Sequence, residues 1–127
     1  KRLEQTQAQV YLVNTGWTGG PQGQGGERFA IPTTRRIVDA IVNQQLIGQE
    51  TVTYPIFDVQ IPQHIAGIDP VLLNPAQCWK DPAAFNITCH KLAGMFQANF
   101  KQFNALDNID VIAAAGPKLH HEETVTA

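Results

Sequence analysis

A glycine-rich stretch between residues 14 and 28 is the feature that most constrains how this chain can fold. Six of the eleven residues from Gly16 to Gly26 are glycine. Glycine has no Cβ, so it admits backbone conformations closed to other residues and lets another surface approach closely. Ordering so many glycines costs conformational entropy. Stretches that carry this cost commonly hold a flat or charged ligand against main-chain N–H groups, so we expect a ligand-binding loop.

The residues on both sides of this stretch predict a mixed α/β fold. The apolar run at residues 10–13 is typical of a short buried strand. Downstream, apolar side chains recur every three or four positions from about residue 34 to 46, which predicts an amphipathic helix. Pro32 and Thr33 or Thr34 are start signals for this helix, and Gly48 is its stop signal.

Two extended pieces and a connector are predicted next. Residues 51–61 alternate apolar and polar side chains on both sides of Pro55, as two short strands do. Residues 62–82 are rich in proline, so we expect an ordered connector without regular structure, which Trp79 pins to the core.

A second main helix is predicted from about residue 82 to 103. Asp81 is a suitable N-cap, and a stripe of aromatic and aliphatic side chains at helical spacing is expected to lie in the core. A last short helix is predicted at about 107–115, and the tail at 118–127 is expected to fray. The fold class is therefore α/β, with short strands packed against two main helices.

Length and composition indicate one globular domain over residues 1–127. A hydrophobic content of 43% and a charged content of 16% are typical of a folded protein. The net charge of -2 gives no basic surface for nucleic acid, and no apolar run approaches the roughly 20 residues of a membrane span. Cys78 and Cys89 lack metal or redox spacing, so we interpret them as reduced thiols of a cytoplasmic protein.

The first residue, Lys1, is neither a methionine nor part of a secretory signal pattern. We therefore expect the chain to be a piece of a longer protein, whose other part supplies chemistry that this piece lacks.

The familiar phosphate and metal motifs do not occur. Gly26 is followed by Glu27 and Arg28 instead of the Lys-Ser or Lys-Thr of a Walker A loop, and no glycine trio has GxGxxG spacing. The four histidines, His64, His90, His120 and His121, show no metal-ligand spacing, and the acidic residues are scattered. Neither a metal site nor a catalytic residue is predicted within this chain.

Three residues beyond the glycines are candidates for ligand contact. The Arg28 guanidinium can stack on or hydrogen-bond to a nucleotide, and apolar Phe29 beside it can face a purine ring. Thr34 lies near a helix start, where its hydroxyl serves either as a cap or as a ligand contact, and the residues alone favour the cap.

Several runs of residues occur in an order that covers nearly the whole chain. The longest is Asn14-Thr15-Gly16-Trp17-Thr18-Gly19-Gly20-Pro21, with Tyr11-Leu12-Val13 before it and Gly26-Glu27-Arg28-Phe29-Ala30-Ile31 and Thr34-Arg35 after it. Later runs are Leu73-Asn74-Pro75 with Trp79, Lys91-Leu92-Ala93-Gly94-Met95-Phe96 with Asn99-Phe100, and Ala115-Gly116-Pro117-Lys118-Leu119. Together they resemble the C-terminal part of ATP-dependent phosphoenolpyruvate carboxykinase.

The resemblance implies an enzyme of gluconeogenesis, a decarboxylating lyase. Such an enzyme converts oxaloacetate and ATP into phosphoenolpyruvate, ADP and carbon dioxide, with Mg²⁺ on the nucleotide and a second ion, typically Mn²⁺. Its metal ligands, its P-loop and the basic residues that grip oxaloacetate lie upstream of the matching part, so this chain is expected to be inactive alone.

The same resemblance implies that Arg28, Phe29 and Thr34 contact the adenosine part of ATP. One departure from the family pattern lies beside them, because Glu27 replaces a lysine or another non-acidic residue. An acidic group there does not help to hold an anionic nucleotide, so either binding is weaker or Glu27 points away. The alternative interpretation is a stand-alone nucleotide-binding or structural module without catalysis.

Overall fold

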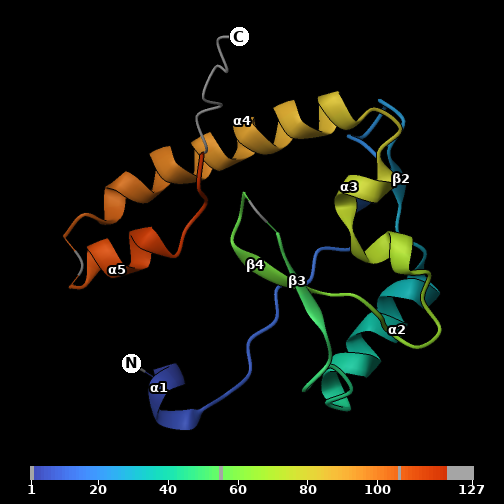
Figure 1. Cartoon of the computed structure of the whole chain (residues 1–127), viewed down its shortest axis with the longest axis horizontal. Helices are drawn as coiled ribbons and strands as arrows, with labels where there is room; N and C mark the ends of the chain where they lie inside the picture. Colours follow the sequence, from blue (N-terminus) through green and yellow to red (C-terminus); the bar gives the residue numbers. More distant parts are fainter. Residues whose placement is uncertain (1, 55, 106, 120–127) are drawn as a thin grey trace, which may run out of the picture.

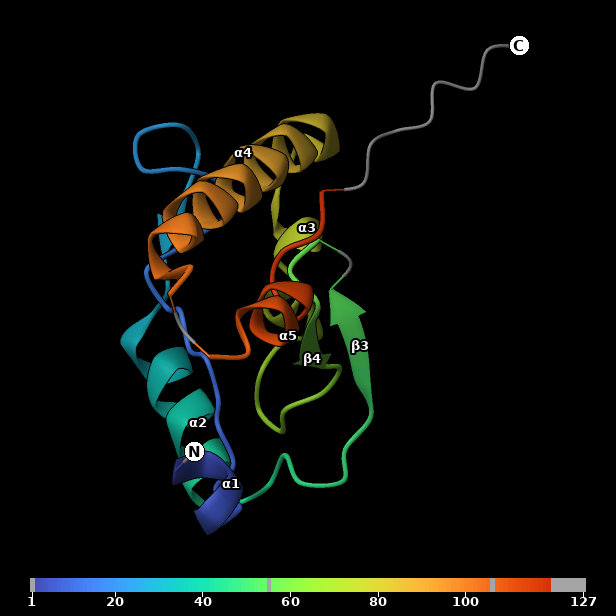
Figure 2. The same ribbon diagram turned by 90° about the vertical axis from the view of Figure 1, so that its left-hand side faces the viewer.

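Short strands and longer helices follow one another along the chain. The computed structural model describes residues 2–54, 56–105 and 107–119. The elements are α1 (Arg2–Thr6), β1 (Trp17–Thr18), β2 (Glu27–Arg28), α2 (Ile31–Val42), β3 (Thr51–Tyr54), β4 (Val59–Pro62), α3 (Pro75–Cys78), α4 (Pro82–Phe100) and α5 (Ile109–Ala114), with 3-10 turns at Pro70–Leu73 and Lys101–Phe103. The predicted α/β class is confirmed. Helix α4 spans one end of the molecule, with α5 and the β3–β4 hairpin beneath it (Figures 1 and 2).

The glycine-rich stretch forms the closed end of a narrow antiparallel ribbon. Strand β1 pairs with β2, so that Trp17 lies opposite Arg28 and Thr18 lies opposite Glu27. Within the loop, the N–H groups of Gln24 and Gly26 both donate to the carbonyl of Pro21, at 3.1 and 3.2 Å. The two sides come so close that a Cβ at Gly26 would overlap the carbonyl of Gly20. Glycine is therefore required there because of close backbone approach.

The strand predicted at residues 10–13 is wrong for this chain. These residues have no regular secondary structure, and the Leu12 side chain is 88% exposed. In the part of the chain that the structure describes, the sheets are the pairs β1–β2 and β3–β4, and neither includes this run. A strand must pair its N–H and C=O groups with a neighbour, so an apolar run without such a neighbour stays outside any sheet.

Helix α2 begins three residues earlier than predicted. Pro32 lies in its first turn, where the fixed φ of proline suits a helix and its missing N–H costs nothing. The N-cap is Ala30, which offers no side-chain oxygen, so the interpretation of Thr33 or Thr34 as the cap is wrong. The helix ends at Val42, and turns lead from there to Gly48, which has a φ of +73°.

The predicted strands at 51–61 are confirmed as the hairpin β3–β4, with Thr51 opposite Pro62 and Tyr54 opposite Val59. The connector after it differs from the prediction because it contains regular structure. Asp69 and Asn74 cap its two short helical pieces by accepting from the N–H groups of Val71 and Ala76. Local side-chain caps of this kind allow single helical turns even where proline is frequent.

Helix α4 follows the prediction at its start. Asp81 Oδ1 accepts from the N–H groups of Ala83 and Ala84, at 2.9 and 3.2 Å, so Asp81 is confirmed as the N-cap. Phe85 is buried and meets the ring of Trp79 at a centroid distance of 5.6 Å. Trp79 thus fixes the connector to α4, as predicted.

The predicted apolar stripe of α4 is only partly covered. Phe85, Cys89 and Ala93 are buried, whereas Phe96 is 53% exposed although its ring contacts Phe57. Apolar side chains also project from other sides of the helix, and Ile87 is 70% exposed. A helix that is apolar on several sides is typical of the interior of a larger protein. Among the described residues, no helix is both long and apolar enough to cross a bilayer.

The buried core of the described residues is small. A small cluster around Ala40, Ile65 and Ile68 and the contacts of Phe85 provide the buried core.

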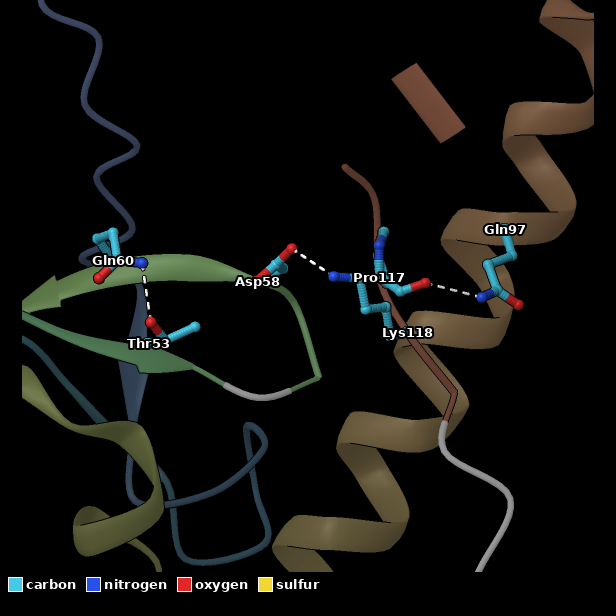
Figure 3. Close-up of polar contacts among 6 residues, drawn as sticks. All are labelled: Thr53, Asp58, Gln60, Gln97, Pro117 and Lys118. Carbon is cyan, nitrogen blue, oxygen red and sulfur yellow. Dashed lines mark hydrogen bonds and ion pairs between the residues drawn. The ribbon is translucent and has the colours of Figure 1, made fainter. Parts of the chain in front are cut away.

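The segment after α5 is fastened to two other elements (Figure 3). The Lys118 N–H donates to the carbonyl of Ile56, and its Nζ lies 2.7 Å from Asp58 Oδ2 in the β3–β4 turn. Gln97 of α4 donates to the carbonyl of Pro117 at 2.8 Å. Lys118 is therefore held in place, contrary to the prediction of a frayed tail, whereas residues 120–127 of that tail lie outside the described residues.

The stability of this fold should depend on alkaline pH through Tyr54 and Cys89, whose Oη and Sγ atoms lie 3.7 Å apart. Burial raises the pKa of Tyr54 above its ordinary 10.0, and the hydrogen bond with Cys89 adds to this. Burial also raises the pKa of Cys89 above 9.0, against a smaller opposing effect of Tyr54. Tyr54 and Cys89 therefore hold their protons more strongly in the folded state than in the unfolded state.

The stabilisation from these two groups is complete below pH 9 and is lost as the pH rises through the folded-state pKa values. We expect the free energy of urea unfolding to fall above pH 9 and to fall less steeply in Tyr54→Phe. Identical slopes for the variant and the unchanged chain would contradict this expectation.

Candidate functional site

The three predicted contact residues lie at the junction between β2 and α2. Arg28 ends β2 and is exposed, while Phe29 and Thr34 are half-buried. The Phe29 N–H donates to the carbonyl of Gly16 at 3.2 Å, which continues the ladder of the ribbon. The Thr34 N–H donates to the carbonyl of Ala30 in the first turn of α2. Since Thr34 is not the N-cap, its hydroxyl is not committed to capping.

The Arg28 side chain lies over an aromatic ring. Its Cζ is 5.7 Å from the ring centroid of Trp17, the residue directly opposite in the ribbon. A cation within about 6 Å of an indole face is attracted by the quadrupole of the ring. The sequence alone did not predict a contact between Trp17 and Arg28, although the register of the ribbon pairs these two residues.

Glu27 occupies a different side of the ribbon from Arg28. It lies opposite Thr18, and successive residues of a strand project to opposite faces. The departure of Glu27 from the family pattern therefore places an acidic group away from the guanidinium.

Two cavities of the structure lie away from this junction. One cavity of about 350 Å³ lies between residues 7–11 and the end of α2, and another of about 210 Å³ lies between the glycine loop and the start of α4. Neither is lined by Arg28, Phe29 or Thr34. The three residues thus share one junction that lies outside both of these cavities.

The two cysteines and His90 make local hydrogen bonds. Cys78 and Cys89 are free thiols, as predicted, and the Cys78 thiol donates to the carbonyl of Val71. His90 Nδ1 lies 2.8 Å from the carbonyl oxygen of Asn86. Among the described residues, no group of three or more potential metal ligands comes together.

Comparison with known proteins identifies the family. The family model described as phosphoenolpyruvate carboxykinase matches residues 1–70, which include the ribbon and all of α2. The chain belongs to the phosphoenolpyruvate carboxykinase family. The resemblance found in the sequence is thereby confirmed.

Relatives in this family extend the match along the chain. Phosphoenolpyruvate carboxykinase (ATP) of Bacillus cereus (strain B4264) is 39% identical over 117 residues, which is 92% of this chain. Phosphoenolpyruvate carboxykinase (ATP) 2 of Moorella thermoacetica (strain ATCC 39073 / JCM 9320) is 42% identical over 117 residues. The chain spans only 22% of the length of each of these phosphoenolpyruvate carboxykinases.

Proposed function

We propose that residues 1–127 are the C-terminal, nucleotide-contacting lobe of an ATP-dependent phosphoenolpyruvate carboxykinase of the cytoplasm. In this proposal the whole enzyme acts in gluconeogenesis, and the β2–α2 junction contacts the adenosine part of ATP. The observation that carries the proposal is the exposed Arg28 guanidinium, which lies 5.7 Å from the Trp17 ring at the end of the glycine ribbon. Phe29 and Thr34 follow it within the same junction.

The reaction explains why such a contact is useful. Loss of carbon dioxide from oxaloacetate leaves an enolate, whose oxygen attacks the γ-phosphorus of ATP as the bond to ADP breaks. Phosphoryl transfer depends mainly on positioning and on neutralising charge. A lobe that holds the adenosine end contributes to the reaction by positioning the nucleotide. The described residues contain no cluster that fits Mg²⁺ or Mn²⁺, so we assign no metal role to them.

The exposed apolar surface supports the proposal of a larger enzyme. Leu12 and Ile87 are 88% and 70% exposed, and the relatives are several times longer than this chain. Burying apolar surface of this kind contributes about 25 cal/mol per Å². We propose that another part of the same polypeptide covers residues 10–13 and the outer side of α4.

An assay of substrate turnover and ATP affinity tests the proposal. This chain alone should show no turnover, while the intact enzyme should lose about tenfold to a hundredfold in ATP affinity on Arg28→Ala, since a hydrogen bond to a charged group is lost. Arg35→Ala is the matched control, because Arg35 is an exposed arginine on the neighbouring helix α2.

Unchanged ATP affinity in Arg28→Ala, measured by calorimetry, would refute the assignment of the junction to adenosine. Nucleotide binding without turnover by the intact protein would instead identify a stand-alone binding module.

A further inference from the structure

Trp17 and Arg28 contact each other across the glycine ribbon. They are direct partners in the register, and Trp17 is 40% exposed, so the contact lies at the surface of the ribbon. The guanidinium lies within the roughly 6 Å at which a cation is attracted to an indole face. Trp17 therefore restricts where the long Arg28 side chain can lie before any ligand arrives.

The chemistry of the contact leaves Arg28 free to bind. A cation–π contact uses the positive charge of the guanidinium and none of its five N–H donors. An aromatic partner therefore orients the side chain without using its donors. A carboxylate partner would occupy those donors and offset the charge, but Glu27 projects from the other face of the ribbon.

We propose that Trp17 is a positioning residue for nucleotide binding, which holds the Arg28 guanidinium in its binding orientation through the cation–π contact. This inference rests on the proposed contact between Arg28 and ATP. Trp17 itself does not touch the nucleotide, and its contribution passes through Arg28 alone.

A double-mutant cycle in the intact enzyme tests the proposal, with ATP dissociation constants from calorimetry. Trp17→Leu should weaken ATP binding about twofold to fivefold, the range for an exposed cation–π contact. Trp17→Phe should restore most of the loss because it keeps an aromatic face. In the Arg28→Ala background, Trp17→Leu should have no further effect. The turnover rate at saturating ATP should stay unchanged in Trp17→Leu, with the effect confined to the KM for ATP.

The outcomes separate this inference from the proposed function. If Arg28→Ala weakens binding but Trp17→Leu does not, or if Trp17→Leu acts equally in both backgrounds, the positioning role is refuted and the adenosine contact stands. If Arg28→Ala does not change the ATP affinity, both the proposed function and the positioning role are refuted. Thermal melting of each variant shows whether a loss of affinity merely reflects unfolding. A ring-current shift of the Arg28 methylene protons, lost in Trp17→Leu, reports the contact without any nucleotide.

Discussion

Phe85→Ala is expected to destabilise the fold by about 3–5 kcal/mol, the range for truncating a buried phenylalanine. Phe85 is 7% exposed, and its ring meets Trp79 of the connector and Tyr54 of the β3–β4 hairpin, at centroid distances of 5.6 and 6.3 Å. Removing the ring leaves a cavity where three segments meet. Because a small domain has only about 5–15 kcal/mol of stability, urea unfolding followed by circular dichroism should show a large loss.

The matched control is Ile87→Ala on the same helix. Ile87 is 70% exposed, so its truncation in this chain should change stability by no more than about 0.5 kcal/mol. Equal losses for the two variants would show that the packing around Phe85 is not what holds α4. A large loss for Ile87→Ala in the intact enzyme alone would support the proposed cover over the outer side of α4.

Gly26→Ala is expected to open the glycine ribbon and to reduce ATP affinity about tenfold or more. The new Cβ would overlap the carbonyl of Gly20 and crowd that of Pro21, and backbone atoms cannot rotate away as a side chain can. The ribbon must shift, and Arg28 lies two residues further along the chain. Faster exchange of the Phe29 N–H, which is bonded to Gly16, would report the opening independently of binding.

Gly94→Ala is the control for the effect of an added methyl group. Gly94 lies within α4, and a Cβ there meets no atom within 4 Å. Alanine favours a helix over glycine by about 1 kcal/mol, so this variant should be more stable and should keep its ATP affinity. If Gly26→Ala behaved like Gly94→Ala, the close approach within the ribbon would have no role.

Local signals predicted much of the secondary structure. Asp81 and Pro82 mark the start of α4 because capping and proline geometry act within one helical turn. The alternation of apolar and polar residues around residue 55 predicted the hairpin, because side chains alternate between the two faces of a strand. Helix α2 begins before Thr33 and Thr34 because Pro32 fits its first turn and Ala30 serves as the N-cap. The connector forms short helical turns because proline is also compatible with the first turn of a helix.

The candidate site was predictable only in part. The sequence motif predicts Arg28, Phe29 and Thr34 as contact residues, and the chain order keeps them at one junction. Their relation to Trp17 and Glu27 required the register of the ribbon, which residue types alone do not specify. That register pairs Trp17 with Arg28 and places Glu27 on the other face of the ribbon.

By itself, the sequence determined the family, the position of the glycine-rich loop and the two main helices, since motifs and helical periodicity act over short stretches of chain. Only the tertiary structure decided which apolar side chains are covered: Phe85 is buried, while Leu12 and Ile87 are open to solvent. The physical reason is that burial depends on which distant segments come to lie against a residue, and a pattern of apolar residues carries no information about that partner.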